Sequence, residues 1–331
     1  MELVVLAVVV FLALSFDFIN GFHDTANAIA ASVSTRALKP RVAIVMAAVM
    51  NFVGAMTFTG VAKTIGSGVA NPADLTNGVE IVIAALISAI AWNLITWWFG
   101  IPSSSSHALI GSLAGAVIAG AGTGAINASG MVDIVKALIL SPLIAFAVGY
   151  TFMIILKYIF AKSSPHRVNK GFRTGQMITA AFQSFSHGTN DAQKAMGIIT
   201  FALVAAEVQD TMDVPFWVKL AAALAMALGT SVGGWKIIKT MGTKIFKIEP
   251  INGFAADIGS AMVIMTATLI HLPVSTTHVI TSSLLGVGSA KRFSSVNWGV
   301  AGRIIVAWFI TIPFTVIMAY IVFWVIDNVF Y

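Results

Sequence analysis

Residues 101–107 read Ile101-Pro102-Ser103-Ser104-Ser105-Ser106-His107, and residues 272–278 read Leu272-Pro273-Val274-Ser275-Thr276-Thr277-His278, 171 positions later. Both stretches lie between apolar segments. Proline ends an incoming helix, and serine or threonine caps the outgoing one. The pattern therefore predicts two similar helix–turn–helix units, one in each half of the chain.

A second pair of polar motifs supports an internal repeat. Residues 20–28 read Asn20-Gly21-Phe22-His23-Asp24-Thr25-Ala26-Asn27-Ala28, and residues 187–195 read His187-Gly188-Thr189-Asn190-Asp191-Ala192-Gln193-Lys194-Ala195. Pro142 and Pro313 match at the same 171-residue offset as the first pair. Apolar helices resemble one another by chance, but ordered polar motifs do not, so the halves are predicted to be repeats.

The composition is that of a membrane protein. Hydrophobic residues make up 58% of the 331 residues and charged residues 10%, against about 45–50% and about 25% in soluble domains. This excludes a disordered chain and argues strongly against a soluble enzyme. Long continuous apolar runs favour helices over a β-barrel. The absence of cysteine excludes disulfides and thiolate metal sites.

The charged linkers indicate the orientation. The net charge of +6 is better explained by Lys and Arg held on the cytoplasmic side than by a nucleic-acid partner. Residues 36–41, 157–173, 236–247 and 291–292 are basic, whereas 74–80 and 207–213 are acidic. Placing the basic linkers in the cytoplasm predicts a multi-pass protein of the cell membrane with both termini outside. The apolar N-terminus, without a basic leader or cleavage site, is expected to be a retained helix.

The apolar segments give the predicted architecture. They lie at about 2–33, 42–65, 79–100, 104–121, 133–158, 176–206, 216–238, 253–271, 276–290 and 300–326. We expect an all-α polytopic membrane protein with two inverted-topology repeats, residues 1–160 and 174–331, and a cytoplasmic linker at 161–173. The Pro-Ser/Thr-His stretches are either tips of re-entrant helical hairpins, which we favour, or turns between full spans.

Two aspartates lie inside otherwise apolar helices. A carboxylate at the bilayer centre costs about 2.5–3.5 kcal/mol on insertion scales and usually marks function. Glycine and short polar residues beside Asp24 and Asp191 are typical of broken helices, whose free carbonyls and carboxylates can coordinate a cation. The structural alternative is that each Asp only caps a half-helix or pairs with Lys194 or a histidine.

The hydroxyl-rich tips are candidate anion sites. Helix N-termini present unpaired N–H groups and the positive ends of their dipoles, and hydroxyls add donors without net charge. One such motif would be read as an ordinary N-cap, but two at repeat-related positions favour a tetrahedral oxyanion. The predicted phosphate-binding residues are Ser104, Ser105, Ser106, Ser275, Thr276 and Thr277.

The histidines allow functional interpretations and a structural one. His107 and His278 follow the tips and either carry a proton, donate to the anion, or are satisfied buried side chains. His23 and His187 are expected to support the aspartates beside them. The sequence contains neither the His/Glu spacing of a helical metalloenzyme nor a glycine-rich Walker loop, so the chain is not predicted to be an enzyme or an ATP-driven pump, and no cofactor is expected.

At these residues the chain resembles the inorganic phosphate transporter (PiT) family. That family carries two Gly-x-Asn-Asp-type motifs, one in each inverted half, and Pro-x-Ser/Thr-Ser/Thr-His tips. The resemblance covers nearly the whole chain and implies secondary uptake of orthophosphate with a coupled cation by alternating access. The family's functional positions correspond to Asp24, Asn27, Asn190 and Asp191, together with the tip hydroxyls.

Two departures from the family pattern bear on the coupling ion. The first motif has His23 where the family usually has asparagine, and Lys194 stands at the position matching Asn27. A lysine ammonium there can take the place of a second sodium ion. The sequence therefore resembles the proton-coupled bacterial branch, which implies H+ carried by Asp24, Asp191, His107 or His278, and a substrate that is phosphate or a neutral metal–phosphate complex.

Several alternatives remain open from the sequence. Sodium could bind at Asp24 and Asn27 instead, with Lys194 reaching an interface. The same fold could carry sulfate or another oxyanion, although carboxylate acceptors favour phosphate, which can donate a proton. A phosphohydrolase would need clustered carboxylates, and a channel would conduct without a cation gradient. The expected partners are inorganic phosphate, possible complexing divalent metal, membrane lipid and a second copy in a homodimer, with no nucleic acid.

Overall fold

A computed structural model describes residues 2–330, which form long helices joined by short turns. The first half contains α1 (Glu2–Ser34), α2 (Pro40–Ala55), α3 (Gly60–Val69), α4 (Gly78–Phe99), α5 (Ser105–Ala121) and α6 (Ala128–Ile159). The second half contains α7 (Pro165–Asp191), α8 (Gln193–Ala205), α9 (Phe216–Val232), α10 (Trp235–Lys239), α11 (Pro250–Leu269), α12 (Thr276–Lys291) and α13 (Trp298–Phe330). Short 3-10 turns η1 (Pro72–Asp74), η2 (Thr123–Ala125) and η4 (Phe293–Ser295), and the π-helical segment η3 (Thr240–Lys244), join them.

Several helices have the length and apolar character of membrane spans. Within the described residues, α1, α4, α6 and α13 can each cross a bilayer alone. The pair α2 and α3 is bent by 72°, and α9 is bent by 62° from the α10–η3 segment, so each pair is either a broken span or a re-entrant loop. The second break follows from Gly233, whose φ of +76° ends α9 in a conformation that favours glycine.

The two halves have the same order of elements and interlock. Helix α1 corresponds to α7 with α8, the bent pair α2–α3 to α9–α10, and α4, α5 and α6 to α11, α12 and α13. Helix α1 packs on α9 and its counterpart α7 packs on α2, while α6 packs on α12 and α13 on α5. Each half therefore buries its helices against the other half. The repeat boundaries at residues 160 and 174 stay a prediction.

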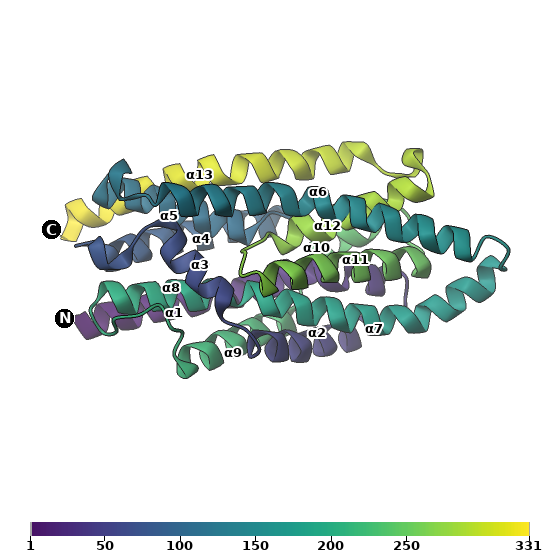
Figure 1. The fold of residues 1–331 in the computed structure, drawn as a ribbon, viewed down its shortest axis with the longest axis horizontal. Helices are drawn as coiled ribbons and strands as arrows, with labels where there is room; N and C mark the ends of the chain where they lie inside the picture. The colour runs from purple at the N-terminus through teal and green to yellow at the C-terminus, as the bar shows by residue number, and fades with distance from the viewer. Residues whose placement is uncertain (1, 331) are drawn as a thin grey trace.

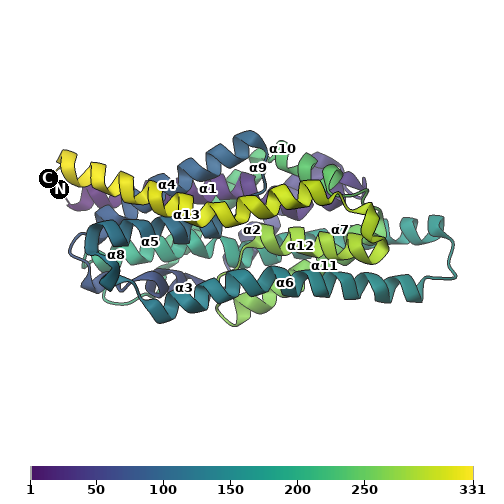
Figure 2. The ribbon, with the colours of Figure 1, turned by 90° about the horizontal axis from the view of Figure 1, so that it is seen from above.

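The two termini lie together at one end of the bundle, and the connection between α6 and α7 lies at the opposite end (Figures 1 and 2). The first repeat therefore begins at one end and the second at the other, as two inverted repeats require. Which end faces the cytoplasm stays a prediction from the basic linkers.

The Pro-Ser/Thr-His stretches are the tips of two helical hairpins, as favoured from the sequence. Helices α4 and α5 form one hairpin, and α11 and α12 form the other from the opposite end of the bundle (Figure 1). Helices α5 and α12 have 17 and 16 residues, fewer than the ~20 needed to cross a bilayer. The tips meet inside the bundle, where the Ser106 hydroxyl donates to the Val274 carbonyl at 2.9 Å.

Glycines allow the helices that carry the aspartates to approach their neighbours closely. A Cβ at Gly188 of α7 would lie 2.3 Å from the Asn51 carbonyl oxygen of α2. At Gly21 of α1, it would lie 2.4 Å from the Met226 carbonyl oxygen of α9. Both contacts are backbone to backbone, which is typical of small-residue packing between membrane helices.

The expected helix break at Asp24 is wrong. Helix α1 runs without interruption through Asp24, and Gly21 serves close packing against α9 instead. At Asp191, α7 ends and α8 begins at Gln193, but the intervening Ala192 keeps helical angles of φ −64° and ψ −23°. Side chains of other helices bind both carboxylates, so the backbone groups that a helix break would expose are not required as partners. The broken helices are α2–α3 and α9–α10.

Candidate functional site

Asp24 of α1 lies where the two hairpin tips meet. Its Oδ2 accepts a hydrogen bond from Ser105 of the first tip at 2.5 Å, and its Oδ1 accepts one from Thr277 of the second tip at 3.0 Å. The adjacent His23 Nδ1 is 2.7 Å from Oδ1. The side chain is 1% exposed. One carboxylate of the first half thus binds hydroxyls from both halves.

Asp191 of α7 has a related environment in the second half. Its Oδ2 accepts a hydrogen bond from Thr276 at 3.1 Å. His187 Nε2 lies 3.2 Å from the same oxygen, and Lys194 Nζ lies 2.9 Å from Oδ1. Asp191 is fully buried. Asp191 thus pairs with Lys194 and with a histidine, which is the structural alternative named from the sequence.

Ser105 joins the two aspartate environments. Its hydroxyl donates to Asp24 and accepts a hydrogen bond from Lys194 Nζ at 2.7 Å. Lys194 is 1% exposed, so its ammonium does not reach an interface. A continuous polar path therefore runs from Asp24 through Ser105 and Lys194 to Asp191, inside the bundle.

The two motif asparagines hold the second tip. Asn27 Nδ2 donates to Thr277 Oγ1 at 2.8 Å. Asn190 Nδ2 donates to the Leu272 carbonyl at 3.3 Å, and its Oδ1 accepts from the Val274 N–H at the same distance. Asn27 thus contacts a hydroxyl that binds Asp24, whereas Asn190 fixes the backbone of the tip.

The six tip hydroxyls predicted to bind phosphate divide into two sets. Ser105, Thr276 and Thr277 face the aspartates. Ser104 and Ser275 accept from the His107 and His278 N–H groups at 3.1 and 3.2 Å, which are N-cap contacts, and Ser106 binds the opposite tip. The capping interpretation therefore fits Ser104 and Ser275, whereas Ser105, Thr276 and Thr277 point their hydroxyls at the carboxylates.

The four motif histidines lie around this centre. His23 contacts Asp24 and also Thr96 of α4, at 3.2 Å from Nε2. His187 Nδ1 is 3.0 Å from Asn51 Oδ1 of α2, so both histidines connect an aspartate to a neighbouring helix, as expected for supporting residues. The His107 and His278 rings are 4.4 Å apart, and His278 stacks on Trp308 at 3.9 Å.

Several buried polar residues, some of them in contact with this centre, were missed from the sequence. Thr96 receives a hydrogen bond from the Ser103 hydroxyl at 2.8 Å and thereby connects the first tip to His23. Asn51 was missed although it lies inside an apolar segment. Asp17 and Asp257 are fully or almost fully buried carboxylates in apolar helices; the rule that selected Asp24 and Asp191 could have found them.

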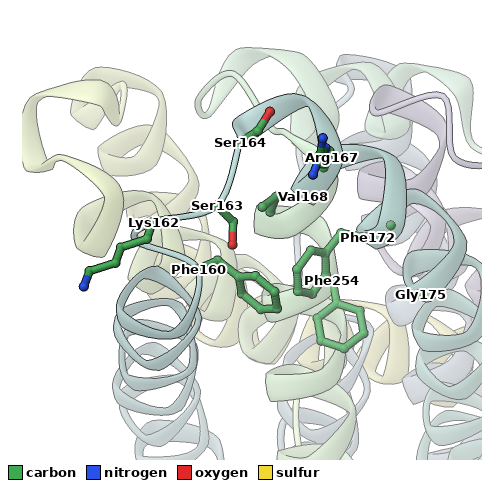
Figure 3. Close-up of a pocket in the computed structure, with 10 residues that line it drawn as sticks. Phe160, Lys162, Ser163, Ser164, Arg167, Val168, Phe172, Gly175 and Phe254 are labelled. Carbon is green, nitrogen blue, oxygen red and sulfur yellow. The ribbon is translucent and has the colours of Figure 1, made fainter.

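An open pocket lies away from this centre. It has a volume of about 610 Å³ and lies beside the α6–α7 connection, lined by Phe160, Arg167, Phe172 and Phe254 among others (Figure 3). Asp191 comes 19 residues after Phe172 in α7, about 28 Å along a helix at 1.5 Å per residue. The polar centre between the tips is therefore a separate feature.

The chemistry of the centre suits a charged solute. Two carboxylates and one ammonium are buried together, and three hydroxyls donate to the carboxylates. An anion replacing a carboxylate as the acceptor would find donors already oriented toward it, and a cation would find carboxylate, amide and hydroxyl oxygens. Groups of this kind inside a membrane bundle mark solute and ion pathways.

Comparison with known proteins agrees with this architecture. A protein of Bacillus subtilis (strain 168) named "Probable low-affinity inorganic phosphate transporter" is 59% identical over 99% of both chains. One of the same name from Rhizobium meliloti (strain 1021) is 45% identical over 96% of this chain and 95% of its own. A solved structure described as "The sodium-dependent phosphate transporter" matches with a TM-score of 0.85 and 25% identity, over 98% of this chain and 100% of that one.

These relatives are transporters rather than enzymes, and the apolar helices make this chain a multi-pass membrane protein. Residues 20–319, which contain both aspartate motifs and both hairpin tips, match the family described as "Phosphate transporter family". The chain belongs to the phosphate transporter family.

Proposed function

We propose that this protein is a secondary active symporter that takes up inorganic phosphate by alternating access, with protons as the coupling ion. The observation that carries the proposal is the meeting of two hairpin tips from opposite ends of the bundle beside Asp24 and Asp191. Inverted repeats that cross at one buried site suit a carrier that opens to each side in turn.

Phosphate binding is proposed to exchange hydrogen-bond acceptors. In the structure Ser105 and Thr277 donate to Asp24, and Thr276 donates to Asp191. Phosphate oxygens arriving between the tips would take over these donors, and Lys194 would supply positive charge. Because the carboxylates then lose their donors, a cation must arrive with the anion to keep the buried charges compensated. This requirement is a physical basis for symport.

The proposal is tested by uptake of labelled phosphate into proteoliposomes that contain the purified protein. Inward proton and sodium gradients are imposed separately, and empty liposomes serve as the control. Accumulation driven by the proton gradient alone supports the proposal. Accumulation that requires sodium and ignores the pH difference contradicts proton coupling, and flux without dependence on either gradient indicates a channel.

Sodium coupling is the second candidate. It is favoured by the name of the structural relative and by Asn27, whose Oδ1 is buried without a hydrogen-bond partner among residues 2–330. Together with Asp24 and the Thr277 hydroxyl, that oxygen offers ligands of the kind that sodium binds. Lys194 favours protons, since its ammonium already supplies fixed charge at the matching position of the second motif. A Lys194→Asn variant that gained sodium-dependent uptake would support this tethered-cation explanation.

The form of the substrate is tested in the same preparation. Uptake measured with and without added divalent cation separates free phosphate from a neutral metal–phosphate complex. Competition by excess sulfate tests the alternative oxyanion. Sulfate lacks a proton near neutral pH and cannot donate to Asp24 or Asp191, so we expect weak competition.

A further inference from the structure

Asp17 is a buried carboxylate two helical turns before Asp24. Its side chain is 0% exposed and forms no hydrogen bond of ordinary geometry within the described part of the chain, although the Asn20 amide lies near enough to interact with it. An unpaired charge buried in this way is strongly unfavourable, and the group usually becomes neutral instead. Asp17 therefore differs from Asp24 and Asp191, whose carboxylates are each contacted by three side chains.

Two buried asparagines lie between the levels of Asp17 and Asp24. Helices α1 and α4 both run from the end that holds the termini, and they pack together, with His23 contacting Thr96. Asn20 and Asn93 come three residues before His23 and Thr96, so they lie at one level of these parallel helices, one turn nearer that end. Both are 0% exposed, and Asn93 has no hydrogen-bond partner among residues 2–330.

Ser112 of α5 lies at the level of Asp17. Helix α5 runs antiparallel to α1 and meets it where Ser105 donates to Asp24. Ser112 is seven residues beyond Ser105, and Asp17 is seven residues before Asp24, which is two turns in each helix. The Ser112 hydroxyl is also fully buried and unpaired in the described structure. We call Asp17, Asn20, Asn93 and Ser112 the Asp17 layer.

The phosphate site proposed above lies close to Asp17. Asp17 is two helical turns before Asp24, about 10 Å along α1, and Ser105 joins Asp24 to the Lys194 ammonium. Asp191 and Lys194 act on Asp17 through their charges, and Asn20 through its side-chain amide on the next turn of α1. The helices α4 and α9 carry Glu80 and Lys219 in their first turns, near the end of the bundle. Because charges interact strongly over such distances in a buried environment, a change of charge at Lys194 is expected to act on Asp17.

We propose that Asp17 is the side chain that carries the coupled proton, and that Asn20 and Asn93, which lie between the levels of Asp17 and Asp24, form its polar path toward the site between the hairpin tips. This inference rests on the proposed proton-coupled uptake of phosphate. Phosphate beside Lys194 neutralises the positive charge that stabilises the Asp17 carboxylate, so phosphate binding favours the protonated carboxyl. By linkage, a proton on Asp17 favours phosphate binding.

Asp257 of α11 provides a matched control. It is also a buried aspartate in an apolar helix, at 3% exposure, but its Oδ2 accepts a hydrogen bond from Thr179 at 3.4 Å. It does not belong to the Asp17 layer or to the site between the tips. Replacing Asp257 by asparagine therefore removes a buried carboxyl elsewhere in the same bundle.

The test compares Asp17→Asn, Asp17→Glu and Asp257→Asn in proteoliposomes by two measurements. The first is exchange of external labelled phosphate for internal unlabelled phosphate, with no gradient of protons or sodium. The second is accumulation driven by an inward proton gradient. For Asp17→Asn we expect the ratio of driven accumulation to exchange to fall about tenfold or more. The reason is that proton binding and phosphate binding are then no longer coupled, so the proton gradient cannot drive accumulation. Asp17→Glu and Asp257→Asn should keep the wild-type ratio.

The outcomes distinguish this inference from the proposed function. Wild-type protein that exchanges no phosphate contradicts the proposed function. Wild-type exchange with accumulation driven by sodium alone contradicts proton coupling and the role of Asp17, but leaves phosphate transport intact. An unchanged ratio in Asp17→Asn, loss of exchange and accumulation together, or the same fall in Asp257→Asn overturns the role of Asp17 alone.

Discussion

Lys194 Nζ and Ser105 Oγ are 2.7 Å apart, although the two residues are separated by 89 positions in the chain. This contact joins α8 of the second half to the tip of the first hairpin. Because Ser105 also donates to Asp24, while Lys194 pairs with Asp191 at 2.9 Å, the single ammonium is linked to both motif carboxylates. A change of charge at one of them is therefore felt at the other.

The first prediction concerns this ammonium. Lys194→Met keeps most of the side-chain volume but leaves Asp191 buried without its cation. Breaking a buried ion pair in this way costs about 3–5 kcal/mol, so we expect a clearly lowered thermal unfolding midpoint in detergent and no phosphate uptake. Adding Asp191→Asn removes the uncompensated charge and should restore much of the midpoint without restoring uptake.

Lys63→Met is the matched control for that measurement. Lys63 pairs with Asp213, but the two side chains are 52% and 71% exposed. Exposed ion pairs contribute little to stability, so the midpoint should hardly change. Equal effects of Lys63→Met and Lys194→Met would argue against a special role for the buried pair.

The second prediction concerns the motif aspartates. Asp24→Asn and Asp191→Asn should each abolish labelled phosphate uptake, since each removes a buried charge that faces the tip hydroxyls. Both variants should still insert into the membrane, because a neutral amide is easier to bury than a carboxylate. Membrane fractionation followed by uptake measures both properties. Normal uptake in both variants would leave these aspartates with a structural role only.

The sequence predicted the fold and the centre of the site because both rest on strong local signals. Hydropathy selects the spans, and proline followed by hydroxyl residues marks the hairpin tips, which the structure places face to face. The expected break at Asp24 failed because partners from distant helices satisfy its carboxylate, and no local pattern reveals such partners. The buried Asn51–His187 contact depends on tertiary packing in the same way.

The third prediction concerns helix packing at Gly188. Gly188→Ala would bring a Cβ to 2.3 Å from the Asn51 carbonyl oxygen. Because that contact is backbone, α7 and α2 must move apart, at a cost of about 1–3 kcal/mol typical of overpacking. Thermal unfolding in detergent measures the loss of stability. Gly302→Ala in α13 is the control, since nothing lies within 4 Å of its added Cβ; a similar loss in both would point to a general intolerance of alanine.

The fourth prediction concerns the anion-binding hydroxyls. Ser105 and Thr276 come from opposite tips and donate to Asp24 and Asp191. If phosphate takes over these donors, each hydroxyl contributes a hydrogen bond to a charged group, worth about 1.5–3 kcal/mol. Ser105→Ala and Thr276→Ala should then each weaken phosphate binding by about tenfold or more, and the double variant by more than either alone. The concentration dependence of phosphate exchange in proteoliposomes measures the phosphate affinity.

Ser88→Ala is the control for these variants. It removes a hydroxyl that donates to the Ala84 carbonyl of its own helix at 2.9 Å, and it should leave the affinity unchanged. Unchanged affinity in the double variant would leave the tips as helix caps and place the phosphate elsewhere in the bundle.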